Sequence, residues 1–311
     1  MLLNADGGTL RREGADVMRE RVASAFAERG MAAEIALVGG GEIGREAERA
    51  AADAAADAQD RRRFDGVVVG GGDGTVGTVA GALAGTGMPL GVLPLGTLNH
   101  FARDLGIAAL DDAVDAIASG ATRQVDIAEV NGRVFVNNSS VGVYPYMVVD
   151  RERRQEHFGR SKWAAMSLAF LRMLRRFPRR RLSICVEGAV HPCVSPCVFV
   201  GNNAYETDLF DFGKRAALDG GELCLYLAKA TSPAGLVSLA FRAAFGGLDQ
   251  AHDFETIKAR TLEIRSRASR LPVSRDGEVE FLAPPLRYRI RPKALAVFAP
   301  APDPAAPEPA G

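Results

Sequence analysis

The pattern of hydrophobic and polar positions divides the chain into two parts. In the first part, short apolar runs alternate with longer amphipathic segments of helical period. Strands that alternate with helices of about 10–20 residues predict a parallel, doubly wound α/β sheet. We expect strands at 2–3, 35–38, 64–69 and 90–93, and helices at 10–29, 45–62, 76–84 and 111–118.

From about residue 123 the segments become short and β-rich, with turn residues between them. This pattern predicts an antiparallel sandwich or barrel, and we favour the sandwich. Two helical segments, about 150–177 and 233–246, interrupt it. The expected strands cover 124–130, 133–140, 181–188, 195–203, 222–229, 261–267, 286–292 and 294–300.

A length of 311 residues is enough for about two domains. We place an α/β domain at 1–122, to which a final strand at 294–299 returns, and a β-rich domain at 123–293. The Pro/Ala-rich tail at 300–311 is expected to be disordered.

The composition, 47% hydrophobic and 24% charged, is that of an ordinary globular protein. Because 38 basic residues balance 38 acidic ones, the net charge indicates no nucleic-acid partner. Four cysteines are too few for a disulfide scaffold in a chain of this length. With no secretory signal pattern and no apolar run of about 18 residues, we expect a soluble cytoplasmic protein, at most peripheral to the inner face of a membrane. The sequence leaves open whether the protein forms a homodimer.

The stretch VVVGGGDGTVG (67–77) carries the first candidate chemistry. Glycines directly after a buried strand let backbone N–H groups approach an anion, and the next helix directs its positive end there. A dinucleotide site needs an acidic residue about 20 positions on, at the end of the next strand, and LGVLPLG has none. A Walker A loop needs a lysine, which is also missing. Asp73 would repel phosphate unless a cation lay between them, so the loop predicts a magnesium–nucleotide site.

A second polar turn, Gly96–Thr97 with Asn99, follows the next strand. Together, GGDGTV and LPLGTLNHFARDLG resemble the diacylglycerol kinase catalytic family, which includes soluble bacterial lipid kinases and sphingoid or ceramide kinases and is related to NAD kinases. The resemblance continues in family order over nearly the whole chain, at Asn4 with 7–9, VDI (125–127), LDGGEL (218–223) and RDGEV (275–279).

The resemblance implies that ATP and Mg²⁺ bind between an α/β nucleotide domain and a β-rich lipid domain. It implies Asp276 or Glu278 as the base that deprotonates the acceptor hydroxyl, and we favour Glu278, with Asp276 near the metal. The implied ligands of the catalytic Mg²⁺ are Asp73 and Asp276, and those of a structural Mg²⁺ are Asp126 and Asp219. The implied ATP-binding residues are Asn4, Gly8, Thr9, Gly71, Gly72, Asp73, Gly74, Thr75, Thr97 and Asn99.

The chain departs from the family pattern at four places. His100 stands where the family usually has Asp, and Gly77 where it commonly has Asn. Gly220 follows Asp219 where a second acidic residue is usual, and VGGGEIG (38–44) lacks the threonine often found there. His100 and Gly220 count against the structural Mg²⁺.

SKWAAMSLAFLRMLRRFPRRR (161–181) combines an apolar face at helical spacing with a basic end. One interpretation is an interfacial helix whose cations meet anionic lipid. The other, which we favour, is a core-packed helix with a solvated basic end. The segment is still the first candidate for membrane docking, through Trp163, Arg172, Arg175 and Arg176.

The sequence therefore predicts an ATP- and Mg²⁺-dependent kinase that phosphorylates a hydroxyl of a membrane lipid, diacylglycerol first. Ceramide or a sphingoid base is the alternative acceptor. An NAD-kinase-like activity comes next, and then a nucleotide-binding regulator without catalysis.

Overall fold

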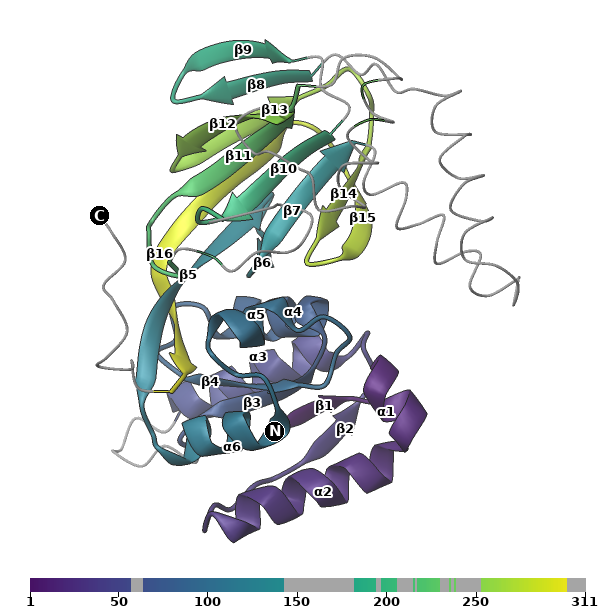
Figure 1. Ribbon diagram of the computed structural model, residues 1–311, viewed down its shortest axis with the longest axis vertical. Coiled ribbons are helices and arrows are strands. Elements are labelled where there is room, and N and C mark those ends of the chain that lie inside the picture. The colour runs from purple at the N-terminus through teal and green to yellow at the C-terminus, as the bar shows by residue number, and fades with distance from the viewer. Residues whose placement is uncertain are drawn as a thin grey trace.

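The computed structural model describes residues 1–56, 64–142, 182–193, 197–205, 215, 217–229, 235, 238 and 253–300. Within them the chain forms an α/β part and a β-rich part, stacked on each other in Figure 1 and connected by two strands that run through both. These strands are β5 (Thr122–Val130) and β16 (Leu286–Phe298). The predicted two-domain architecture is confirmed.

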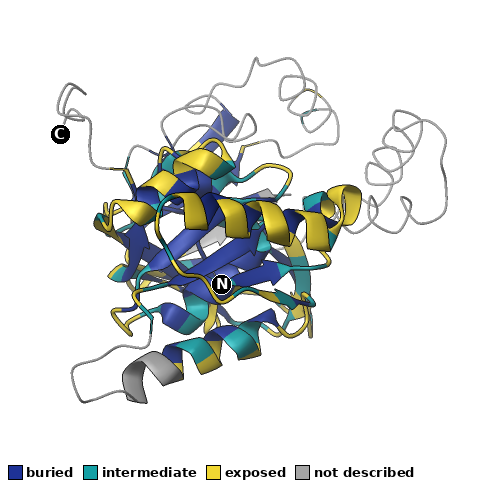
Figure 2. Ribbon diagram, turned by 90° about the horizontal axis from the view of Figure 1, so that it is seen from below, coloured by how far each residue is buried: buried dark blue, intermediate teal, exposed yellow. Residues whose placement is uncertain are grey.

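The α/β part is built on a parallel sheet in the order β2-β1-β3-β4. Apolar residues such as Leu3, Val69 and Leu93 are buried in it, and Figure 2 shows helices with exposed outer faces around the buried strands. The strands are β1 (Leu2–Asn4), β2 (Ala36–Val38), β3 (Val67–Gly71) and β4 (Leu90–Pro94). The helices are α1 (Gly8–Glu13), α2 (Ala15–Glu28), α3 (Ile43–Ala56), α4 (Asp73–Leu83), α5 (His100–Asp104) and α6 (Leu110–Ala118).

The β-rich part is an antiparallel sandwich around its own apolar cluster, which includes Val198, Val200 and Tyr288. One sheet has the order β12-β11-β10-β7-β14-β15. The other continues the sheet of the α/β part through β16, β13, β8 and β9, with β5 paired to β16 and β6 to β5. The remaining bounds are β6 (Arg133–Phe135), β7 (Asn138–Gly142), β8 (Leu182–Val186), β9 (Ala189–Cys193), β10 (Cys197–Asn202), β11 (Leu223–Ala228), β12 (Phe254–Ala259), β13 (Thr261–Arg265), β14 (Leu271–Arg275) and β15 (Glu278–Leu282).

β16 connects the two cores. It pairs with β5 and β13 in the sandwich and, through Val297 opposite Leu90, runs parallel to β4. The register with β5 shifts between Arg291 and Leu295. The two strands expected at 286–292 and 294–300 are thus one strand with an irregularity, because Lys293 adopts φ +49° without ending the pairing.

Other helices and strands also differ from those predicted. The helix expected at 10–29 is two helices, because Gly14 has φ +92°, which no helix accommodates. The strand expected at 133–140 is divided into β6 and β7. Helix α5 and strands β9, β12, β14 and β15 were not predicted.

Several sequence predictions fall outside the described residues. They include the helix expected at 150–177, the tail beyond 300 and the membrane-docking candidates Trp163, Arg172, Arg175 and Arg176. Among the described residues, none of the helices has the length and apolar character needed to cross a bilayer.

Candidate active site at the junction of the two domains

The loops that follow β1, β2 and β3 converge, because the carboxyl ends of neighbouring parallel strands meet at one edge of a sheet. Asn4 at the end of β1 donates from Nδ2 to Oγ1 of Thr75 in α4 (2.8 Å). Asp6 accepts a hydrogen bond from the N–H of Gly40, in the loop after β2 (2.9 Å). Asn4 and Thr75 thus hold loops together, while Gly8 and Thr9 form the first turn of α1.

Glycines at the end of β3 and in the loops that follow β3 and β4 permit close packing at the junction. A Cβ on Gly70 would lie 2.5 Å from Cδ2 of Leu3, and one on Gly71 would lie 2.8 Å from Cβ of Thr75. A Cβ on Gly96 would lie 2.4 Å from Cα of Gly72, so the loop before α4 and the loop before α5 are in contact. Side chains at these positions would separate the two loops.

Helix α4 directs its N-terminus at this junction. Gly72 is the N-cap and provides no side-chain cap. The first backbone N–H groups of a helix have no partner within it, and the helix dipole gives them a partial positive charge. The start of α4 is therefore suited to bind an anion such as phosphate.

Asp73, the first residue of α4, accepts three hydrogen bonds from the protein. The N–H of His100 donates to Oδ2 (3.2 Å), and the N–H of Phe101 donates to Oδ1 (3.0 Å). Asn137, between β6 and β7, also donates from Nδ2 to Oδ1 (3.0 Å). The carboxylate thus binds the start of α5 to α4 and links both to the β-rich part.

Asn99 shapes the second predicted turn. It adopts φ +53° and donates from Nδ2 to the carbonyls of Pro94 (3.0 Å) and Gly96 (3.1 Å). Its Oδ1 accepts from the N–H of Gly96 (2.8 Å). Its side chain is therefore used inside the turn, whereas Thr97 is exposed at the turn's surface.

Asp276 and Gly277 are the two-residue turn of the β14–β15 hairpin, with φ +45° and +87°. Asp–Gly is a preferred pair for such turns, because both positions need positive φ. The Asp276 carboxylate accepts from the N–H groups of Val136 (2.9 Å), Asn137 (2.8 Å) and Asn138 (3.2 Å). The turn aims Asp276 into the junction and fixes its position there.

The hairpin turn lies against the first turns of α4. A Cβ on Gly77 would lie 2.6 Å from Oδ2 of Asp276, and one on Gly74 would lie 2.3 Å from Oε1 of Glu278. Asp276 and Glu278 therefore contact the same face of α4, at Gly77 and Gly74, which are three residues apart. Glu278 is exposed. Two carboxylates of the β-rich part thus meet the anion-binding end of a helix of the α/β part.

Desolvation raises the pKa of Asp276 to about 7, and the negative charge of Asp73 acts in the same direction. The N–H groups of Val136, Asn137 and Asn138 oppose the rise. A carboxylate with a pKa near 7 is suited to accept a proton near neutral pH.

Comparison with known proteins assigns both parts of the chain. Residues 1–130 match the family model described as the diacylglycerol kinase catalytic domain. Residues 147–299 match the one described as the YegS C-terminal NAD kinase beta sandwich-like domain. The chain therefore carries a diacylglycerol kinase catalytic domain followed by a YegS-type C-terminal domain.

Individual relatives agree with this family. A diacylglycerol kinase of Bacillus subtilis is 44% identical over 85 residues, which cover 26% of this chain and 28% of that protein. One of Mycobacterium tuberculosis is 32% identical over 167 residues, or 51% and 49% of the two chains. The matches thus span half or less of these relatives. A crystal structure of a diacylglycerol kinase from Bacillus anthracis covers 98% of this chain and 96% of its own at a TM-score of 0.69 and 20% identity, a likeness of fold.

The kinase family implies a catalytic Mg²⁺, and the side chains at the junction fit one. Mg²⁺ is usually held by one or two carboxylates and by the phosphates of the substrate. Oδ2 of Asp73 accepts one hydrogen bond, from His100, and keeps a lone pair. Asp73 and the exposed Glu278 are the carboxylates that could hold it, since Glu278 lies against Gly74, next to Asp73.

The predicted structural Mg²⁺ finds no such fit at Asp126. The Asp126 carboxylate accepts from the N–H groups of Lys293 (2.7 Å) and Gly221 (2.6 Å) and from Nδ2 of Asn203 (3.1 Å). Asp219 instead pairs with Arg123 (3.4 Å), and the described residues hold no group of three His, Cys, Asp or Glu suited to a metal.

Replacing Asp126 by asparagine is expected to lower the free energy of unfolding by about 2–4 kcal/mol, because the amide NH₂ would face backbone donors in a buried site. Urea unfolding measures this loss. The matched control Asp219→Asn breaks an exposed pair and should cost less than about 1 kcal/mol. A chelator should leave the unfolding midpoint of the wild type unchanged, and a fall on chelation would show that a metal does hold this loop.

Two residues that link the junction were not among the predicted site residues. Asn137 contacts Asp73 and Asp276, and Arg215 donates from Nη2 to Oδ1 of Asn137 (3.1 Å). The pair Asn137–Asn138 at the end of an apolar run was one available signal. Nothing local to Arg215 in the sequence indicated its role.

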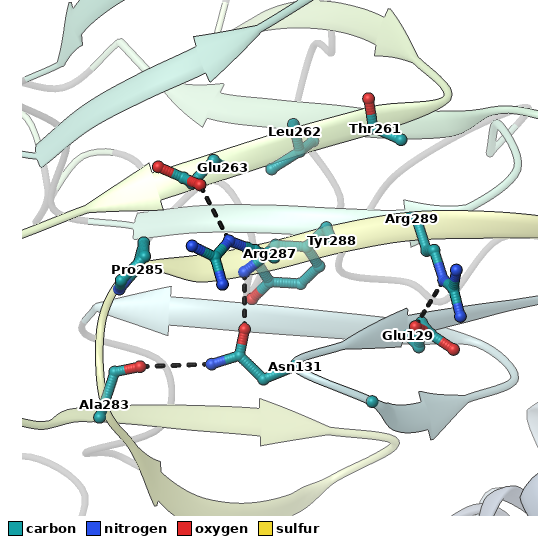
Figure 3. A pocket seen from close by; sticks show the side chains of 11 residues that line it. Glu129, Asn131, Thr261, Leu262, Glu263, Ala283, Pro285, Arg287, Tyr288 and Arg289 are labelled. Carbon is teal, nitrogen blue, oxygen red and sulfur yellow. Dashed lines mark hydrogen bonds and ion pairs between the residues drawn. The ribbon is translucent and has the colours of Figure 1, made fainter.

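A hollow of about 770 Å³ lies elsewhere, on the outer face of β5, β13 and β16 (Figure 3). Arg287 on its wall pairs with Glu263 (3.2 Å), and Arg289 pairs with Glu129 (2.6 Å). Because these cations already have carboxylate partners, the hollow has no excess charge with which to recognise a phosphate.

Proposed function

We propose that the protein is an ATP-dependent lipid kinase that transfers the γ-phosphate of ATP to a hydroxyl of a membrane lipid, diacylglycerol first. One observation carries this proposal: Asp276 and Glu278 lie against Gly77 and Gly74, at the positive end of α4. An anion-binding helix end beside paired carboxylates is the arrangement that phosphoryl transfer requires, since that reaction depends on positioning and charge neutralisation.

In this proposal the start of α4 holds the phosphates of ATP, and Asp73 fixes α5 and Asn137 around them. Mg²⁺, when bound with ATP, would neutralise charge on the phosphates. The lipid hydroxyl oxygen forms the new bond to the γ-phosphorus, the bond to the β–γ bridging oxygen breaks and ADP leaves. The hydroxyl proton passes to Oδ2 of Asp276, which accepts a single N–H bond, from Val136.

Asp276 as the base differs from the sequence prediction, which favours Glu278. Asp276 is held by three N–H groups and has a pKa near 7, whereas Glu278 is exposed on the side of Gly74. A fixed acceptor of suitable pKa is the better base. Glu278 is then the carboxylate that faces the metal and the arriving phosphate.

The acceptor is chosen by analogy with relatives that are named diacylglycerol kinase. Such a lipid lies in a bilayer, so we expect a cytoplasmic protein that contacts the membrane surface peripherally. The direct test is purified protein with γ-labelled ATP, Mg²⁺ and mixed micelles of diacylglycerol, ceramide or a sphingoid base, with NAD as the soluble control. Label in diacylglycerol supports the proposal. Label in NAD alone, or nowhere, contradicts it.

The pH dependence tests the base. The pKa of Asp276 is raised to about 7, so its proton-accepting form is populated above that pH and lost below it. We expect kcat/KM to rise about tenfold per pH unit below about 7 and to level off above it. A profile that is flat between about pH 5.5 and 8.5 would contradict the assignment, because an ordinary carboxylate is fully ionised there.

A further inference from the structure

Asp104 and Arg215 form a buried ion pair across the junction. Nε of Arg215 lies 2.6 Å from Oδ2 of Asp104, and their side chains are 0% and 9% exposed. Asp104 ends α5 in the α/β part, and Arg215 lies between β10 and β11 in the β-rich part. Phe101, one turn before Asp104, packs its ring 5.7 Å from the guanidinium carbon. Removing two charges from water carries a large desolvation cost, so a buried pair is weak evidence for a purely stabilising role.

The other side-chain donors of Arg215 point into the β-rich part. Nη1 donates to the carbonyls of Val136 (2.6 Å) and Asn202 (3.3 Å). Nη2 donates to Oδ1 of Asn137 (3.1 Å). A guanidinium is a rigid planar fork, so acceptors on α5, β10 and the β6–β7 connection fix its plane.

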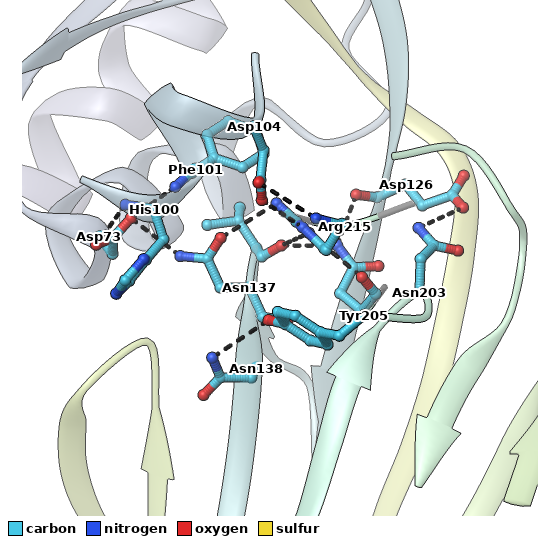
Figure 4. Close-up of polar contacts among 12 residues, drawn as sticks. Asp73, His100, Phe101, Asp104, Asp126, Asn137, Asn138, Asn203, Tyr205 and Arg215 are labelled. Carbon is cyan, nitrogen blue, oxygen red and sulfur yellow. Dashed lines mark hydrogen bonds and ion pairs between the residues drawn. The ribbon is translucent and has the colours of Figure 1, made fainter. Parts of the chain in front are cut away.

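The guanidinium determines how the Asn137 amide is oriented. Arg215 has only donors, so the amide oxygen of Asn137 must face it, and the amide NH₂ then faces Asp73. Figure 4 shows Asn137 between Asp73 and Arg215. The backbone N–H of Asn137 donates to Asp276 in addition (2.8 Å). One buried residue, 2% exposed, thus binds two carboxylates of the candidate site, Asp73 and Asp276.

We infer that Arg215, held by Asp104, is a positioning residue for the phosphoryl transfer: it orients Asn137, whose two N–H donors keep Asp73 and Asp276 in place. This inference rests on the proposed function. Without the oriented amide, Oδ1 of Asp73 loses a donor and its repulsion of Asp276 is less compensated. Because Arg215 and Asp104 come from different parts of the chain, the arrangement forms only when the two parts are docked as they are here.

Arg215→Lys tests the role of the planar fork. Lysine keeps the positive charge beside Asp104, but an ammonium cannot reach Asp104 and Asn137 at once. We expect kcat to fall about tenfold or more, with KM for ATP within about twofold, and Asn137→Ser to give a similar loss. The double variant should be no worse than either single variant, because both remove the same interaction. The control Arg123→Lys, at the exposed pair with Asp219, should keep the wild-type kcat.

Losses in the two single variants that multiply in the double variant would overturn the inference. So would an Arg215→Lys protein that keeps the wild-type kcat.

A second measurement needs neither activity nor a folded variant. In the wild type, the side-chain amide protons of Asn137 should exchange with solvent at least about 100-fold more slowly than those of an exposed asparagine, as judged by NMR. Exchange at the exposed rate would overturn the inference. If the amide protons are protected but the protein phosphorylates no lipid, the proposed function is wrong. The arrangement of Arg215 and Asn137 would still be supported.

Discussion

Replacing Asp276 by asparagine is expected to lower kcat about 10³-fold while ATP affinity stays within about threefold. The substitution removes the proton acceptor, and a positioned base contributes about 10²–10⁴-fold to a rate. Asparagine can still accept from the N–H groups of Asn137 and Asn138, but its NH₂ would face the N–H of Val136. A loss of stability of about 1–3 kcal/mol should therefore accompany the change. Steady-state kinetics, calorimetric titration with ATP and urea unfolding measure the three quantities.

Glu278→Gln is the matched comparison, since it neutralises the other carboxylate of the same hairpin. Glu278 is exposed and lies against Gly74. We expect a smaller loss of kcat, about tenfold, and an unchanged unfolding midpoint. The rise of kcat/KM with pH should persist in Glu278→Gln and vanish in Asp276→Asn. The opposite result, a much larger loss in Glu278→Gln, would return the role of base to Glu278.

The sequence predicted the fold because its signals are local. Apolar runs such as Val67–Val69 and Leu90–Leu93 and the helices between them repeat at a spacing that only a parallel sheet satisfies. The β-rich part was predicted in outline, but strands such as β12 and β14 lack a clear alternation of apolar and polar residues. Their structure depends on partners that are distant in the chain, as when Val273 pairs with Val141.

The candidate site was predicted in its residues but not in its contacts. Asp73 was expected to need a cation because its neighbours in sequence are glycines. Its actual partners, Phe101 and Asn137, are 28 and 64 positions away. The Asp276–Gly277 turn was different, because Asp–Gly flanked by strands is a known hairpin signal and could have been recognised.

Gly77→Ala is expected to lower kcat about 100-fold without unfolding the protein. A new Cβ would lie 2.6 Å from Oδ2 of Asp276, a carboxylate that three N–H groups hold in place. The turn must then move away from α4, and a displacement near 1 Å can cost about 10²-fold in rate. In α4 itself, alanine is favoured over glycine by about 1 kcal/mol, which offsets part of the strain. The free energy of unfolding should therefore change by less than about 1 kcal/mol.

Alanine at two other glycines of α4 shows whether the loss of kcat comes from the contact with Asp276 or from any added side chain in this helix. At Gly74 the new Cβ would meet the exposed Glu278 side chain from Cγ (2.7 Å) to Oε1 (2.3 Å). The side chain must then adopt another rotamer, so Gly74→Ala should cost about tenfold, as Glu278→Gln does. At Gly81 the nearest atom is Cβ of Val134 at 3.3 Å, away from both carboxylates, and kcat should stay within about twofold. Steady-state kinetics and urea unfolding of the three variants test this order. If all three lost activity in proportion to stability, the contact between Gly77 and Asp276 would have no special role. Loss at Gly77 alone, at constant stability, would mean that this chain needs glycine at position 77, because Asp276 occupies the space that a side chain would fill.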